Sequence, residues 1–113
     1  GTDMEVIIDL GQNTTFSNIQ TTFFQYYLSW IVLPTSVSYA ISDDGENFTE
    51  LDSLTHNIPL MKEGKFKHTF SFENENIKTK YLKVSAKTVG KLPKEHPAAG
   101  SDAWIFIDEI IIN

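Results

Sequence analysis

Short segments in which apolar and polar residues alternate with a period of two recur along the chain. The pattern is clearest in residues 37–41 (VSYAI) and 81–87 (YLKVSAK), where one side of each segment is apolar and the other polar. Successive side chains of a β-strand point to opposite faces, so this alternation predicts half-buried strands. No window combines helical apolar spacing with capping residues, so we expect an all-β chain.

We expect seven strands, separated by clusters of glycine, proline, asparagine and aspartate. In addition to the two segments above, they span residues 5–10, 19–27, 48–51, 66–72 and 104–112. Strands with one polar face, mixed with more apolar strands, are typical of two packed sheets. The predicted architecture is therefore an antiparallel β-sandwich or jelly roll whose loops gather at its two ends.

Residues 42–48 (SDDGENF) join two of the predicted strands through an Asp-Gly pair. Glycine after aspartate supplies the positive φ that a tight hairpin turn needs, so we interpret the segment as a turn. An acidic calcium-binding loop is the alternative. The spacing of an EF-hand loop, with glycine at its sixth position, is missing.

Composition and charge exclude several classes of protein. Of the 113 residues, 41% are hydrophobic and 21% charged, which is typical of one globular domain with a single core. The net charge of −6 argues against nucleic acid as a partner, because phosphate backbones require clustered lysine and arginine. No apolar run approaches the roughly 18 residues of a membrane-spanning helix, so no membrane insertion is expected. The first methionine is Met4, and we interpret the chain as a module excised from a longer polypeptide.

The sequence contains no recognisable set of catalytic residues. A glycosidase needs two carboxyl groups that face each other across roughly 5–9 Å, whereas Asp108 and Glu109 are neighbours and are expected to point to opposite faces of one strand. His56, His68 and His96 lack the spacing of a zinc site. No serine nucleophile motif is present, and the absence of cysteine excludes thiol nucleophiles. We therefore do not expect this chain to be an enzyme.

Aromatic residues near strand ends are the remaining functional signal. Trp30, His96 and Trp104 lie at strand ends or in loops, where a rigid scaffold usually presents its binding groups. Tyr26 and Tyr27 lie where a strand gives way to the next loop. Flat aromatic faces with a few polar groups suit sugars, so these five residues are candidates for carbohydrate binding.

A packing role is the alternative for several of these aromatic residues. Trp30 and Trp104 would then close the ends of the apolar core. Phe23 and Phe106 are expected to pack inside it, because alternating aromatic residues fill sandwich interiors.

Four motifs, taken in order, resemble the discoidin or coagulation-factor type C family. They are EVIIDLG, SWIVLPTSVSYAISDDGENFTEL, TKYLKVSAK and WIFIDEIIIN, and together they cover nearly the whole chain. The resemblance implies a galactose-binding-like jelly roll. Within that group, SWIVLP and GKLPKEHPAAGSDAWIFIDEI most resemble the C-terminal module of chitobiase-type β-N-acetylhexosaminidases, which are family 20 glycoside hydrolases of Bacteroidetes.

The narrower resemblance implies a non-catalytic accessory module of a secreted hexosaminidase, since the catalytic residues of such enzymes belong to a separate barrel domain. It implies weak binding of glycans that contain N-acetylglucosamine or galactose, in the periplasm, at the cell surface or outside the cell. One alternative is a structural module that packs against the catalytic domain of the same polypeptide. Another is a protein-binding or adhesion domain.

The family often holds a structural calcium ion, and Glu109 is similar to the glutamate that it places near the last strand. The early loop of that calcium site has no counterpart here, because residues 1–11 look like the second stretch of the domain. The first strand is therefore expected to be missing. The resemblance implies no other cofactor.

Overall fold

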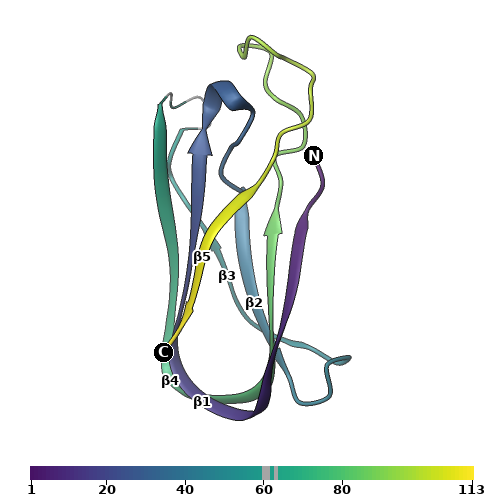
Figure 1. The fold of residues 1–113 in the computed structure, drawn as a ribbon, viewed down its shortest axis with the longest axis vertical. Coiled ribbons are helices and arrows are strands. Elements are labelled where there is room, and N and C mark those ends of the chain that lie inside the picture. Colours follow the sequence, from purple (N-terminus) through teal and green to yellow (C-terminus); the bar gives the residue numbers. More distant parts are fainter. Residues whose placement is uncertain (60–61, 63) are drawn as a thin grey trace.

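The computed structural model describes residues 1–59, 62 and 64–113 and consists largely of β-strands (Figure 1). Among the described residues there is no α-helix, which confirms the all-β prediction, and hence no helix that could span a membrane. The strands are β1 (Met4–Tyr26), β2 (Ser36–Ser42), β3 (Thr49–Thr55), β4 (Lys65–Lys87) and β5 (Phe106–Ile112), and a short 3-10 turn, η1 (Tyr27–Ser29), follows β1.

One antiparallel sheet, in the order β3-β2-β4-β1-β5, curls over to form two facing layers. β1 and β4 are each 23 residues long and bend together at the lower end of Figure 1. The first part of β1 pairs with the last part of β4, and this layer is extended by β2 and β3. The last part of β1 pairs with the first part of β4, and that layer is extended by β5. The predicted β-sandwich is thus confirmed as a single curled sheet.

The seven predicted strands correspond to five, because two pairs of segments are continuous. Residues 5–10 and 19–27 both belong to β1, apart from the last residue, which begins η1. Residues 66–72 and 81–87 both belong to β4. The polar segments between them bend without leaving the sheet.

Shifts in pairing allow β1 to bend and still face the core in both layers. The register of β1 against β4 shifts between Asp9 and Thr14 and again between Phe16 and Asn18. The even-numbered Phe16 is buried before the second shift, and the odd-numbered Ile19 is buried after it. A β-bulge has this effect, since extra residues on one strand change the phase of the side chains and increase the bend.

The hydrophobic core fills the space between the layers with apolar residues at alternating strand positions. Phe23 and Phe70 meet edge to face in it, with ring centroids 5.7 Å apart. The buried members of the core are Phe16, Ile19, Phe23, Leu33, Val37, Tyr39, Phe70, Ile77, Leu82, Val84 and Ala86. Burial of Phe23 confirms its predicted packing role.

Tyr39 places a hydroxyl group between the two layers. The hydroxyl lies 2.6 Å from Thr21 Oγ1 and donates a hydrogen bond to the main-chain carbonyl of Phe70 at 3.3 Å. Burial raises the pKa of this phenol above its usual value of 10, and the hydrogen bond with Thr21 offsets part of that rise. The folded protein therefore holds the Tyr39 proton more tightly than the unfolded chain does.

Stability should consequently fall at alkaline pH. Tyr39 contributes no pH dependence well below pH 10, but the free energy of unfolding should decline as pH rises between the unfolded and folded pKa values, because the unfolded chain binds fewer protons there. In Tyr39→Phe this part of the decline should disappear. The variant should also be about 1–3 kcal/mol less stable at neutral pH, since Thr21 loses its partner. Urea unfolding of both proteins from pH 7 to 11 measures this, and equal declines would contradict it.

The Asp-Gly segment forms the predicted turn between β2 and β3. The Asp44 carboxylate accepts hydrogen bonds from the main-chain N–H groups of Glu46 and Asn47, both at 2.8 Å, and from the Ser42 hydroxyl at 2.7 Å. These bonds, the main-chain bond from Asn47 foremost, hold the pKa of Asp44 well below its usual range. Gly45 has a φ of 79°, the left-handed conformation for which glycine is suited.

Candidate functional site

The five candidate binding residues, which are distant in sequence, come together at one end of the molecule. Tyr26 ends β1, Tyr27 begins η1, and Trp30 follows η1. His96 and Trp104 lie in the connection from β4 to β5, which forms the upper end of the molecule in Figure 1 beside the turn after β1. The fold thus assembles the residues that the sequence only indicated one by one.

Trp30 and Trp104 are joined through their main chains. The Trp104 N–H donates to the Trp30 carbonyl at 2.9 Å, and the Val32 N–H donates to the Trp104 carbonyl at 3.1 Å. Trp30 has a φ of 69°, an uncommon left-handed conformation for a bulky residue. Both residues remain exposed, Trp30 by 39% and Trp104 by 61%. The hydrogen-bonded main chain thus holds the two tryptophan side chains where they are exposed to solvent.

Two more apolar residues, Leu28 and Phe106, each lie two positions from one of these tryptophans in the chain, and both are more than half exposed. Phe106 lies opposite Phe24 across the β5–β1 pair, where the two rings meet edge to face at 6.0 Å. We refer to Leu28, Trp30, Trp104 and Phe106 as the apolar rim.

The prediction that Phe106 packs inside the core is wrong. The segment around it is apolar at successive positions, so alternation did not distinguish its inner from its outer face. The neighbours Ile105 and Ile107 pack against the core instead.

His96 is buried next to the rim, and both of its ring nitrogens are engaged. Nε2 donates to the Tyr27 carbonyl at 2.7 Å, and Nδ1 accepts a hydrogen bond from the Ala98 N–H at 2.9 Å. The imidazole also packs against the Tyr27 ring, with centroids 4.3 Å apart. His96 therefore ties the β4–β5 connection to η1 and supports the rim from within.

Tyr27 belongs to a second, small apolar cluster. Its buried partners in the cluster are Val32, Leu92 and Ala103. Tyr26 is half-buried, with the Lys65 ammonium 4.5 Å from the centre of its ring. Of the five candidates, the two tryptophans face solvent, Tyr26 does so in part, and Tyr27 and His96 are buried.

Asp108 and Glu109 do not alternate as the sequence predicted. Thr22 and Phe23 are adjacent in β1 but pair with Glu109 and Ile107, so Asp108 is the extra residue of a bulge. Both carboxylates are exposed, and Asp108 forms an ion pair with Lys67 at 3.0 Å. The expectation that the two point to opposite faces is wrong, because the bulge interrupts the alternation.

Glu109, the residue that the resemblance linked to calcium, is exposed on β5. Calcium in proteins takes about six to eight oxygen ligands. Within the described parts of the chain, no three acidic or histidine side chains come close enough to hold a metal ion. Calcium can also be held by main-chain and amide oxygens, so the calcium ion that the resemblance implied stays a prediction.

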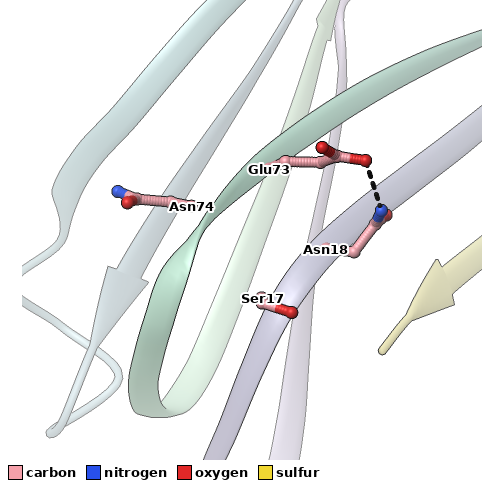
Figure 2. Close-up of a pocket in the computed structure, with 4 residues that line it drawn as sticks. All are labelled: Ser17, Asn18, Glu73 and Asn74. Carbon is pink, nitrogen blue, oxygen red and sulfur yellow. Dashed lines mark hydrogen bonds between the residues drawn. The ribbon is translucent and has the colours of Figure 1, made fainter.

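A polar hollow of about 680 Å³ lies where β1 and β4 bend, and Figure 2 shows the four side chains that line it: Ser17, Asn18, Glu73 and Asn74. Two smaller hollows, of about 360 and 160 Å³, lie on the outer face of the first layer and beside the Asp-Gly turn. None of the three is lined by a residue of the rim. The polar hollow was not predicted from the sequence, although residues 11–18, polar or small apart from Phe16, and the polar residues 73–76 interrupt the strand pattern there.

Comparison with known proteins connects the chain to one family. A family model described as the F5/8 type C domain matches residues 1–109. No curated protein sequence matches the chain. Among solved structures, the chain is similar to the C-terminal domain of a chitobiase from Bacteroides fragilis, with 11% sequence identity and a TM-score of 0.49. That match covers 100% of this chain and 66% of the solved one.

Proposed function

Since the chain belongs to the F5/8 type C, or discoidin, family, we propose that it is a non-catalytic module that binds carbohydrate weakly through its apolar rim. Domains of this family commonly bind carbohydrates or proteins. The observation that carries the proposal is the pair of exposed tryptophans, Trp30 and Trp104, joined by main-chain hydrogen bonds. Exposed aromatic faces on a rigid scaffold suit the apolar faces of sugar rings.

The expected affinity of such a rim is low. Covering roughly 150 Å² of one indole contributes about 4 kcal/mol before ordering costs, which corresponds to about millimolar binding. A millimolar site becomes effective when it is tethered to an enzyme, because the linkage raises the local concentration. Weak binding is therefore consistent with an accessory role.

For the parent protein, we propose a secreted bacterial β-N-acetylhexosaminidase of the chitobiase type. The order of the sequence motifs supports this identity, and the ligands would be glycans that contain N-acetylglucosamine or galactose. Such polymers lie outside the cell, so the module would act in the periplasm, at the cell surface or beyond it. Catalysis would belong to another domain of the polypeptide.

Trp104→Ala should weaken glycan binding at least tenfold, because the most exposed indole is lost. Calorimetric titration with chitooligosaccharides and with galactosides measures the change. Ile7→Ala is the matched control, since it removes another exposed apolar side chain but from β1 in the opposite layer, and it should leave binding unchanged. Unchanged affinity in Trp104→Ala, or no binding of either sugar class by the unmodified chain, would contradict the proposal.

A second candidate function is docking against a protein surface, such as the catalytic domain of the same polypeptide or an adhesion partner. It is favoured by the fact that the rim is apolar and lines none of the three hollows. Interfaces between domains commonly bury about 600–1,500 Å². If docking is the function, Trp104→Ala should weaken the contact between the module and the rest of its parent protein, and the β4–β5 connection should be cleaved faster by proteases. Glycan binding should not change.

A further inference from the structure

We propose that the polar hollow at the bend of β1 and β4 is a second carbohydrate site, which holds sugar hydroxyls by hydrogen bonds and does not depend on the rim. The bend of β1 and β4, where the lining residues lie, is at the opposite end of the molecule from η1 and the β4–β5 connection (Figure 1). The hollow's volume of about 680 Å³ is within the range of small-molecule sites, about 300–1,000 Å³. The described residues that line it all carry polar side chains, so recognition there would differ from stacking on the rim.

The hollow exists because the two long strands separate at a bulge. The pair Phe16–Ile77 is followed by the pair Asn18–Glu73, so residues 74–76 of β4 face Ser17 alone. The backbone of β4 is turned at this point, where Asn76 has a φ of 45°. Bulges re-aim side chains and are over-represented next to functional sites.

Main-chain hydrogen bonds hold the β1 side of the hollow in place. The N–H groups of Ser17 and Asn18 both donate to the main-chain oxygen of Asn113, at 2.9 and 3.1 Å. The Asn113 N–H donates in return to the Asn18 carbonyl at 3.0 Å. A ligand would therefore meet groups that are already ordered, which reduces the entropic cost of binding.

The side chain of Asn18 leaves one buried acceptor unsatisfied. Its Nδ2 donates to Glu73 Oε1 at 3.2 Å, as Figure 2 shows, while its Oδ1 is buried without a hydrogen-bond partner among the described residues. Turning the amide around would place Oδ1 against the Glu73 carboxylate, two acceptors facing each other, so Glu73 fixes the orientation. A buried carbonyl without a donor is unfavourable, and a ligand hydroxyl could donate to it only after the Asn18 side chain shifts toward the hollow.

The chemistry of the lining favours a ligand that donates hydrogen bonds. The Glu73 carboxylate has acceptor positions beyond the one that Asn18 uses, and the Ser17 hydroxyl both donates and accepts. Neighbouring hydroxyl groups of a sugar ring offer two donors at fixed spacing, which suits the acceptors of Glu73 and Ser17. The carboxylate, together with the net charge of −6, disfavours anionic ligands.

Titration of the isotope-labelled chain, followed by the NMR signals of its backbone amides, tests the site. Methyl β-galactoside and N,N′-diacetylchitobiose are the probes, and binding of either should shift the amides of Ser17, Asn18, Glu73 and Asn74. Glu73→Gln should weaken this binding at least tenfold, because the charged acceptor is lost. The matched control is Glu50→Gln, an exposed carboxylate on β3, and it should have no effect.

The experiment distinguishes sugar binding at the hollow from sugar binding at the rim. Trp104→Ala should leave the shifts around the hollow intact even if it abolishes binding at the rim. If Glu73→Gln unfolds, Ser17→Ala is the second variant and should weaken binding severalfold. The proposal is overturned if neither sugar shifts these amides, if the Glu73 and Ser17 variants bind as the unmodified chain does, or if ethanolamine binds there and the sugars do not.

Discussion

Replacing Phe23 with alanine is expected to lower the free energy of unfolding by about 3–5 kcal/mol. Phe23 is fully buried between the two layers, with its ring against that of Phe70. The resulting cavity cannot collapse easily, because β1 and β4 run through both layers and fix their separation. Since domains of this kind have a total stability of about 5–15 kcal/mol, the variant should lose a large part of it.

Phe106→Ala is the matched control for this prediction. It removes the same ring from the neighbouring strand, but Phe106 is 51% exposed, so the expected loss is about 1 kcal/mol or less. Urea unfolding followed by circular dichroism compares the two variants. Similar losses would contradict the assignment of Phe23 to the interior and Phe106 to the rim.

His96→Ala is expected to cost about 2–4 kcal/mol and to loosen the connection between β4 and β5. The substitution removes a buried ring that packs on Tyr27 and one of the hydrogen bonds to the Tyr27 carbonyl, and it leaves the Ala98 N–H without its His96 partner. The connection carries Trp104, so glycan binding at the rim should also weaken. His96 would thus act on binding as a positioning residue.

Hydrogen exchange measures this effect on the connection residue by residue. In His96→Ala the amides of Ala98, Leu92 and Ala103 should exchange faster, whereas those of Val37 and Val84 in the core should change less. Glu95→Ala, a change at the exposed neighbour, should alter none of them. Unchanged protection of Ala98 in the His96 variant would show that the histidine does not hold the loop.

The sequence predicted the strands well but not how they connect. Alternation is a local property, so it identified residues 5–10 and 19–27 as strands without showing that both belong to β1. The residues between them include a single large apolar residue, Phe16, which is too little to reveal the bulge opposite Ser17. For the same reason, the period-two alternation of strand residues could not predict that Asp108 is an extra residue in β5.

The sequence and the tertiary structure therefore determine different features of this protein. The order of polar and apolar residues, with Asp-Gly at the turn, was enough to determine an all-β chain and to place Trp30 and Trp104 near strand ends. Only the tertiary structure decided that both tryptophans face solvent while His96 is buried, and that Asn18 meets Glu73 across a hollow. Exposure and pairing depend on contacts between segments far apart in the chain, such as Tyr27 and His96, which are 69 residues apart, and a local pattern does not encode such contacts.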